Sequence, residues 1–355
     1  MPKPFVSVLI DTYNHEGFIE QAIASVLEQT LPEPDVEVIV VDDGSTDRTP
    51  EIVRRFEPRV RLLRKTNGGQ ASAFNAGIPE CKGGIIAFLD GDDWWMEQKL
   101  ARVTAVLEAS PDVGMVGHGI TVMYEDGREQ TEVLKEGDRF SLTSMEGARM
   151  FRVRKNFLGG ARMTVRASLL RQLLPVPEEI RIEADEFVFT MAAALSAVCI
   201  LPETLFFYRI HAANHFSLHT FDELRARRKQ QSLASLAGHL ATRLRAMAIR
   251  EEVIQAVVQD VQIEADQLRL AVDGGYPWET VKTEAAMYQL LHGDASWPHR
   301  IFKYGTLFPA YFLPPRLYYS VRRWLAASSL YLRLRESLLP VPQPKHTVRE
   351  WKTGT

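Results

Sequence analysis

Cysteine is scarce in this chain of 355 residues, which holds only Cys81 and Cys199. The two lie far apart and lack the spacing of zinc ligands, so the sequence predicts neither a disulfide framework nor a zinc site and fits a reducing cytoplasm. A strong excess of charge of one sign is also absent, since the formal net charge is -3. This balance gives no general electrostatic reason to expect a nucleic acid as partner.

Long hydrophobic runs are missing as well. No uninterrupted apolar stretch reaches the roughly 18 to 20 residues that a membrane-spanning helix needs. The first strand-like segment begins at Phe5, so we expect no secretory signal peptide before it. Internal repeats, a Walker pattern and a G-x-G-x-x-G motif are absent too. With 46% apolar residues, the chain is expected to form one large domain and a smaller appendage.

Near the start of the chain, four apolar segments each run directly into a polar cluster. Helical patterns lie between them, so the sequence predicts an α/β fold with a mostly parallel sheet and helices on both faces. Right-handed crossovers bring the clusters to the carboxyl edge of such a sheet, where open α/β sheets bind ligands. The clusters are Asp11 to Asn14, Asp42 to Ser45, Lys65 to Gly69 and Asp90 to Asp93.

The fourth cluster is the most informative, because the apolar strand Ile85 to Leu89 ends in Asp90, Asp92 and Asp93. Carboxylates this close repel one another, and charges at a half-buried strand end are costly unless a cation or hydrogen bonds compensate them. Oxygen ligands suit Mg²⁺ or Mn²⁺. The alternative interpretation is a solvated Asp-Gly turn that caps the following helix.

The predicted edge carries the side chains that a nucleoside diphosphate needs. The ring of Tyr13 can lie against a base, and Asp43 can accept a hydrogen bond from a base or a ribose hydroxyl. Asp92 can hold a metal that bridges phosphate oxygens, and such a metal stabilises a leaving diphosphate. The amides of Asn14 and Asn67 add further polar groups.

Four motifs follow one another in order: Val6 to Asn14, Val38 to Asp47, Asn67 to Gly77 and Phe88 to Asp93. Together they resemble the signature of family 2 inverting glycosyltransferases with the GT-A fold, over about residues 5 to 215. The resemblance implies Asp43 and Tyr13 at the base, Asp90 near the donor ribose and sugar, and Asp92 with Asp90 as ligands of Mn²⁺ or Mg²⁺. The predicted donor-binding residues are Thr12, Tyr13, Asn14, Asp42, Asp43, Asn67, Asp90, Arg209 and His211.

An inverting transfer also needs a base that takes the proton of the acceptor hydroxyl. Asp185 and Glu186 precede an apolar helical pattern, and the helix dipole favours ionised acids at such a start. The stretch is similar to the family's Glu-Asp motif, with Ala184 in place of the first acid. We predict Asp185 as the base, with Glu186 and Glu183 as alternatives. The competing interpretation is that these acids merely cap the helix.

Two further stretches match the family and one residue departs from it. Tyr208 to Asn214 resembles the closing Tyr-Arg-x-His-x-x-Asn element, from which Arg209 or His211 would reach the diphosphate, although a lone histidine can equally be structural. Gly159 to Met163 occupies the stretch where such enzymes build part of the acceptor pocket. At Phe74 many members carry arginine, so a contact with the donor phosphate or sugar is in question.

The second half of the chain turns helical. From Phe302 to Leu339, aromatic and aliphatic residues alternate with arginines, which indicates either an amphipathic segment on an anionic membrane surface or helices packed on protein. The tail beyond it is rich in proline and is expected to be disordered. The predicted divisions are a catalytic domain, a helical extension, the basic aromatic segment and the tail, at residues 1–220, 221–300, 301–340 and 341–355.

The sequence therefore predicts a cytoplasmic, metal-dependent, inverting glycosyltransferase, with the inner face of the plasma membrane as a possible place of action. The donor is a nucleoside diphosphate sugar, most simply UDP-linked, and the acceptor is a hydroxyl of a glycan or glycolipid. The resemblance adds a setting in bacterial surface polysaccharide synthesis, and self-association stays open. Two alternatives are a sugar-nucleotide nucleotidyltransferase and a non-catalytic nucleotide-sugar-binding scaffold. The departures at Phe74 and Ala184 favour the scaffold.

Overall fold

The computed structural model describes the chain in five stretches, residues 6–31, 35–211, 222–292, 297–327 and 347–352. The chain divides into two compact units. The first unit comprises residues 1–218, 239–257 and 346–355, and the second comprises residues 219–238 and 258–345. Helices α8 (Glu223–Ala246) and α9 (Glu251–Asp273) contribute residues to both units.

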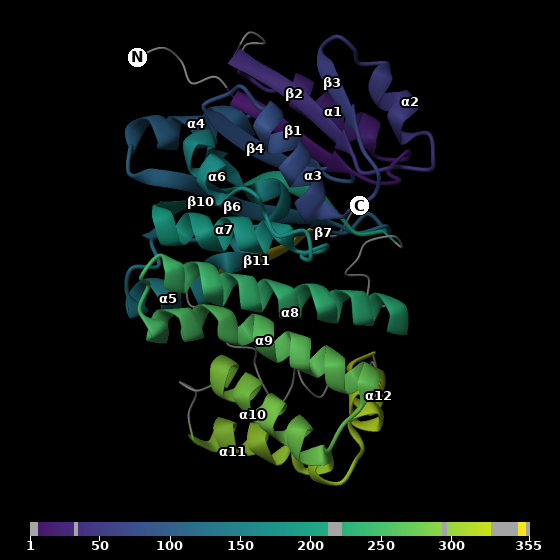
Figure 1. Ribbon diagram of the computed structural model, residues 1–355, viewed down its shortest axis with the longest axis vertical. Helices are drawn as coiled ribbons and strands as arrows, with labels where there is room; N and C mark the ends of the chain where they lie inside the picture. Colours follow the sequence, from purple (N-terminus) through teal and green to yellow (C-terminus); the bar gives the residue numbers. More distant parts are fainter. Residues whose placement is uncertain (1–5, 32–34, 212–221, 293–296, 328–346, 353–355) are drawn as a thin grey trace. The chain divides into compact units, whose positions relative to one another are not determined.

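Within the described residues, the first unit is built on an 11-stranded mixed sheet (Figure 1). Its parallel part has the strand order β3-β2-β1-β4. Strands β9, β6, β7 and β11 continue the sheet through antiparallel pairs, and β10 runs parallel to β6. The strands are β1 (Val6–Thr12), β2 (Val36–Asp42), β3 (Val60–Arg64), β4 (Ile85–Asp90), β5 (Trp94–Trp95), β6 (Val113–Met123), β7 (Glu129–Leu134), β8 (Asp138–Phe140), β9 (Thr164–Arg166), β10 (Ala197–Arg209) and β11 (Thr347–Lys352).

Alternate residues of the parallel strands meet different helices. Val8 shares one hydrophobic core with Ile23 of α1, whereas Leu9 points to the other face, where it approaches Gly77 of α3. Burial on both faces explains why these strands are nearly continuous runs of Val, Ile and Leu. The helices of this unit are α1 (Ile19–Leu27), α2 (Thr49–Arg54), α3 (Gln70–Gly77), η2 (Ile78–Glu80), α4 (Lys99–Ala109), α5 (Met145–Arg154), η3 (Lys155–Phe157), η4 (Gly160–Arg162), α6 (Ala167–Leu173) and α7 (Ala184–Leu195).

The carboxyl ends of the parallel strands align at one edge of the sheet. Thr12 at the end of β1 lies opposite Asp42 at the end of β2, and Asp42 lies opposite Arg64 of β3. On the other side of β1, Asp11 lies opposite Asp90 of β4. This register confirms the predicted mostly parallel sheet and brings the polar strand ends together.

The outer strands include a hairpin and correct one expectation. Strands β6 and β7 pair in antiparallel fashion around a turn at Tyr124 to Gly127. The tail was expected to be disordered, but Thr347–Lys352 forms β11, which pairs with β7. The edge of a sheet offers unpaired backbone groups to which another segment can hydrogen-bond, and the composition of the tail does not reveal such a pairing. Residues 341–346 and 353–355 lie outside the described residues.

The second unit is helical, as expected for the region after residue 220. Its core includes Leu270, Tyr318 and Tyr319, and Arg322 forms an ion pair with the buried Glu284. No helix in the described part of the chain combines the length and the apolar character needed to cross a membrane. The predicted basic aromatic segment is described only as far as residue 327. The remaining helices are α10 (Pro277–His292), α11 (Trp297–Gly305), η5 (Phe308–Tyr311) and α12 (Pro315–Ala327).

Candidate active site

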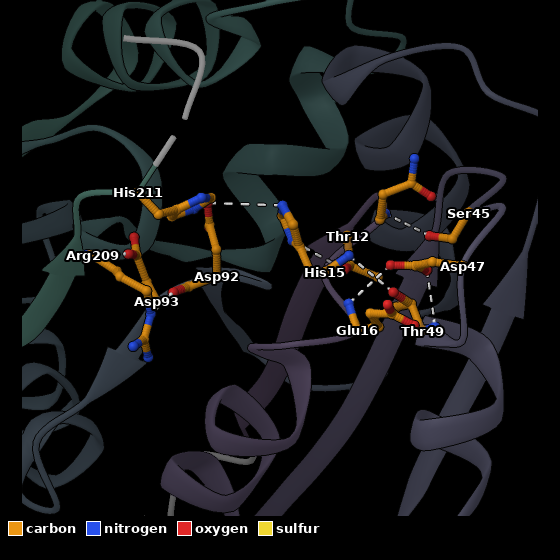
Figure 2. A network of polar contacts seen from close by, with 11 residues as sticks. Thr12, His15, Glu16, Ser45, Asp47, Thr49, Asp92, Asp93, Arg209 and His211 are labelled. Atoms are coloured by element: carbon orange, nitrogen blue, oxygen red, sulfur yellow. Dashed lines mark hydrogen bonds and ion pairs between the residues drawn. The ribbon is translucent and has the colours of Figure 1, made fainter. Parts of the chain in front are cut away.

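The turn after β1 is tied to the turn after β2, as Figure 2 shows. The backbone N–H of Asn14 donates to Ser45 Oγ at 2.9 Å, and that of His15 donates to Thr49 Oγ1 at 2.9 Å. In return, Asn14 Oδ1 accepts a hydrogen bond from the N–H of Thr46 at 2.8 Å. Asn14 has a φ of 56°, a left-handed conformation that asparagine tolerates better than most residues. The two turns therefore form one fixed wall.

Asp43 organises the loop that follows β3. Its carboxylate accepts hydrogen bonds from the N–H groups of Gly68 at 3.0 Å and Gly69 at 2.7 Å, and it lies 2.7 Å from Lys65 Nζ. Asp43 is almost fully buried, so these contacts fix the loop after β3 at the carboxyl edge of the sheet. The ring of Tyr13 stays 43% exposed, so it is open to a planar ligand.

The other predicted donor residues at this edge differ in exposure. Asp42 is fully buried; its Oδ1 accepts from the N–H of Ser45 at 2.9 Å and its Oδ2 lies 3.1 Å from Arg64 Nε. Thr12 is also buried, with Oγ1 at 3.2 Å from His15 Nδ1. Asn67, by contrast, is exposed. Asp42 and Thr12 therefore support the edge from within, and Asn67 lies on its surface.

Asp92 lies between two imidazoles (Figure 2). Its Oδ2 is 3.0 Å from His211 Nε2 and 3.8 Å from His15 Nε2. The ring of His211 packs against Phe18 with centroids 4.5 Å apart. Burial alone would raise the pKa of Asp92, but the hydrogen bond of His211 and the charges of His15 and His211 lower it below its usual value. The structure thus joins residues that are more than a hundred positions apart in sequence.

Arg209 holds the end of β10 against the acidic turn. Its backbone N–H donates to Asp93 Oδ1 at 2.9 Å, and its Nε donates to the carbonyl of Asp92 at 3.1 Å. The guanidinium lies 4.4 Å from the ring centre of Trp94 and 4.9 Å from that of Phe18. These contacts position the end of β10, which His211 follows, and the expected contact of Arg209 with a diphosphate stays a prediction.

Asp90 and Asp185 converge on the short helix η4. The N–H of Gly160 donates to Asp185 Oδ2 at 2.7 Å. A Cβ placed on Gly160 would lie 2.8 Å from Asp90 Oδ2, and one placed on Gly159 would lie 2.6 Å from Asp185 Oδ2. An alanine at either position would force the nearby carboxylate to shift. The acidic turn after β4 and the start of α7 therefore meet at one place.

Burial and mutual repulsion strongly affect these acids. Burial, followed by the charges of Asp92 and Asp185, raises the pKa of Asp90 to about 7. Burial also raises the pKa of Asp185, against the opposing effects of hydrogen bonds from the backbone of Gly160 and Glu186. Acids with raised pKa values that gather at a sheet edge are characteristic of functional sites.

The start of α7 is capped from another motif. Gln70 Oε1 accepts hydrogen bonds from the N–H groups of Ala184 at 2.9 Å and Asp185 at 3.4 Å. The backbone of Gln70 in turn donates to the carbonyl of Arg181 at 3.1 Å. Gln70 stands in the Asn-Gly-Gly-Gln segment, but nothing in the sequence links it to Asp185. Its amide fixes the loop after β3 to the helix that carries the predicted base.

The alternative acids beside Asp185 have different surroundings. Glu186 Oε1 lies 2.6 Å from Lys155 Nζ, so its charge is compensated by a lysine. Glu183 caps α7 with a left-handed backbone at φ 64°, a strained conformation for a glutamate. Of the three acids, only Asp185 has a carboxylate held at η4 beside Asp90.

Two cations near the acids were not predicted, the buried Lys99 and the partly buried Arg162. Lys99 is fully buried; its Nζ donates to the carbonyl of Ala161 at 2.5 Å and lies 3.6 Å from the ring centre of Trp95. Burial lowers the pKa of Lys99 well below its usual value. Arg162 donates from Nε to the carbonyl of Gly159 at 3.1 Å. A lysine in the first turn of a helix normally indicates a solvated face, so the sequence offered no signal for Lys99.

A hollow of about 450 Å³ is lined by residues that include Gln21 and Ala24 of α1, together with Trp94 and Phe207. The rings of Trp94 and Phe207 stack with centroids 5.0 Å apart. None of the predicted donor-binding residues lines this hollow, but Arg209 contacts both Trp94 and Gln21 of its lining.

The comparisons with known proteins agree with this geometry. The model of the glycosyl transferase family 2 matches residues 7–173. An uncharacterized glycosyltransferase of Nostoc sp. is 32% identical over 217 residues, which cover 59% of this chain and 66% of that protein. The uncharacterized glycosyltransferase EpsJ of Bacillus subtilis is 33% identical over 219 residues, which cover 58% of this chain and 61% of that protein.

The region of residues 7–173 belongs to glycosyltransferase family 2. Among solved structures, residues 1–349 of TarS from S. aureus, described in complex with UDP-GlcNAc, align with a TM-score of 0.51. The alignment covers 86% of this chain and 91% of that one at 19% identity. This likeness confirms the predicted GT-A fold. The matched stretch spans less than two thirds of the relatives' own length, so it identifies the family and not a particular substrate.

Phe74 departs from the pattern of this glycosyltransferase family in a physically clear way. Its side chain is almost fully buried, and its ring packs edge-to-face on Phe88 with centroids 4.9 Å apart. The position therefore contributes to the core between α3 and β4. A donor contact from this position, such as the arginine of other members would make, is absent in this chain.

The donors at the predicted metal site are few. Among the described residues, no group of three or more His, Cys, Asp or Glu side chains is arranged to hold a metal ion. Asp92 and His211 nevertheless offer two adjoining donors, and Mg²⁺ is commonly held by one or two carboxylates together with substrate phosphates and water. Asp92 thus fits a shared site of this kind. Asp90, which lies against η4, stays a prediction as a metal ligand.

Replacing Gly160 with alanine tests the convergence at η4. Gly160 and Gly127 both have positive φ, at 53° and 82°, but a Cβ at Gly127 meets nothing within 4 Å. Both Gly160→Ala and Gly127→Ala should lose about 1–2 kcal/mol to backbone strain. Only Gly160→Ala should lose more, because its methyl group collides with Asp90 Oδ2. Thermal or urea unfolding of both variants measures this, and equal losses would show that the crowding is not real.

Proposed function

We propose that this chain is an inverting glycosyltransferase that moves a sugar from a nucleoside diphosphate donor to the hydroxyl of a glycan or glycolipid. The observation that carries the proposal is the partly buried carboxylate of Asp185, held by the N–H of Gly160 beside Asp90. Membership of family 2 supports a transfer of this type. The free state of Cys81 and Cys199 fits action in a reducing cytoplasm.

The donor would bind along the wall formed by the turns after β1, β2 and β3. The exposed ring of Tyr13 provides a face for the base. Asp43, with the loop of Gly68 and Gly69, provides hydrogen-bonding groups close by. We propose that the nucleotide of the donor is uridine diphosphate. TarS, which has the same fold, is described in complex with UDP-GlcNAc.

Asp185 is the proposed base. Its carboxylate would accept the proton of the acceptor hydroxyl while that oxygen bonds to the anomeric carbon, on the face opposite the bond to the leaving diphosphate. The proton moves to Asp185 and the electron pair of the broken bond leaves with the diphosphate. A pKa raised by burial makes a carboxylate a stronger base at neutral pH. The positive charge of Arg162 opposes that rise and keeps the ionised form populated.

Asp92 and His211 are the residues that would hold a divalent cation. When bound there, Mg²⁺ or Mn²⁺ would neutralise charge on the leaving diphosphate. His15, which lies 3.8 Å from Asp92, completes the surroundings of that carboxylate. Arg209 would keep the turn and the strand end in register for this purpose, because it contacts both Asp92 and Asp93.

Asp185→Asn should leave donor binding unchanged and lower transfer by roughly 10²- to 10⁴-fold, the usual contribution of a general base. Glu186→Gln is the matched control, because Glu186 is the next residue and already contacts Lys155; it should retain most of the rate. The wild-type rate should also fall as the pH is lowered, since protonation removes the base. Because the pKa of Asp185 is raised, this fall should be centred above pH 3.8, the ordinary pKa of an aspartate. Turnover measured as release of nucleoside diphosphate tests this. An unchanged rate in Asp185→Asn would move the assignment to Glu186 or Glu183.

Asp92→Ala should abolish the stimulation of transfer by Mn²⁺ or Mg²⁺, because it removes the carboxylate that His211 contacts. The measurement is a titration of turnover with each cation, in the variant and in the wild type. Glu16→Ala serves as a control, since Glu16 lies in the same network (Figure 2) but pairs with the exposed Arg48. Near-normal, cation-dependent turnover in Asp92→Ala would reject the metal assignment.

A further inference from the structure

Helix α12 of the second unit has two apolar faces, and only one of them is used in packing. Tyr318 and Tyr319 are buried in the core of the unit. A second set of large apolar residues on the same helix is exposed. Their spacing places them on a single stripe of the helix. The stripe consists of Leu317, Val321, Trp324 and Leu325.

The segment before α12 extends this pattern. On α11, Trp297, Ile301 and Tyr304 recur at intervals of four and three residues, and all three are exposed. On η5 and just after it, Phe308 and Phe312 are 66% and 69% exposed, and their ring centroids lie 5.1 Å apart. Helix η5 contacts both α10 and α12. We call the exposed apolar residues of α11, η5 and α12 the aromatic surface.

The charged side chains of the segment that carries the aromatic surface are of one sign. Residues 297–327 contain no Asp or Glu, although the chain as a whole has a net charge of -3. Arg322 is neutralised by Glu284 of α10, while Arg300 and Arg316 are exposed. The surface therefore combines exposed aromatic rings with uncompensated positive charge, within the described residues of this segment.

Exposed aromatic rings together with positive charge favour one kind of partner for the aromatic surface over another. A second copy of the chain would bring the same positive charge to a two-fold contact, and like charges across an interface are unfavourable. An anionic lipid surface brings the opposite charge, and aromatic side chains are favoured at the level of the headgroups. Since no described helix can span a membrane, the contact would be interfacial.

We propose that the aromatic surface docks this protein onto anionic lipid membranes, with its aromatic side chains at the headgroup level and Arg300 and Arg316 near the lipid phosphates. The docking itself does not depend on the proposed reaction. One consequence does rest on the proposed function: docking would concentrate the enzyme where a lipid-linked acceptor resides.

Co-sedimentation of the full chain with vesicles tests the docking. The protein should bind vesicles that contain phosphatidylglycerol and bind phosphatidylcholine vesicles only weakly, and added salt should reduce the difference. The double variant Phe312→Ser with Trp324→Ser should lower partitioning about tenfold or more, because it removes two rings from the interface. Arg316→Gln should lower binding to the anionic vesicles alone, by about fivefold for one cation.

Two control variants come from α5 of the first unit. Val153→Ser and Arg149→Gln also replace an exposed apolar residue and an exposed cation, and they should bind vesicles as the wild type does. Melting curves show whether each variant is folded. Because all substituted side chains are exposed, their melting points should match the wild type, and donor hydrolysis should be retained.

Three results would overturn the proposal. The first is absence of wild-type binding to anionic vesicles. The second is binding that the aromatic and arginine variants do not weaken relative to the controls. The third is a concentration-dependent dimer in sedimentation velocity that the same variants abolish while vesicle binding is absent, which would assign the surface to a second copy of the chain. Loss of transferase activity with intact vesicle binding would instead contradict only the proposed function.

Discussion

The hydrogen bond from the N–H of Gly160 to the carboxylate of Asp185 is the contact on which the candidate site depends. It brings the start of α7 to the acidic turn after β4, two elements separated by about a hundred residues. The free energy for this arrangement comes from elsewhere, because it places several carboxylates in a buried region. The core of the parallel sheet, with residues such as Val8 and Ile23, supplies the packing that tolerates it.

The cost of the acidic cluster explains the groups around it. Burial and neighbouring carboxylates raise the pKa values of Asp11, Asp90 and Asp93. Two imidazoles, the partly buried guanidinium of Arg162 and the buried ammonium of Lys99 lie close by, and the charges of Arg162 and Lys99 interact with Asp90. The site is thus only partly neutralised by the chain itself. A divalent cation and the positive end of a helix are the remaining ways in which proteins stabilise such charges.

The parallel sheet and its acidic edge were predictable because both follow from local patterns. Apolar runs such as Ile85 to Leu89 specify buried strands, and the crossover rule fixes which edge their ends share. Asp185 could also be named as a candidate from the sequence, since an acid at the start of an apolar helical pattern is recognisable from its immediate neighbours. These predictions needed no knowledge of contacts between distant residues.

The rest depended on tertiary contacts that spacing does not encode. Gln70 caps α7 and Lys99 contacts Ala161 across the fold, and neither partner can be read from its neighbours in sequence. The sequence could also not show that Arg209 lies against the rings of Trp94 and Phe18, because this contact depends on the position of β10 in the sheet. The strand β11 likewise arises from an available edge of β7, which the composition of a proline-rich tail conceals.

The strand-end turns are proposed to form one site for a nucleotide and a cation together. The melting temperature of the wild-type chain, measured with UDP, with Mn²⁺ and with both, tests this most directly, since a ligand that binds only the folded state raises that temperature by mass action. UDP and Mn²⁺ together should raise the melting temperature by clearly more than the sum of their separate effects. Additive shifts, or no shift with any combination, would show that the nucleotide and the cation do not share a site.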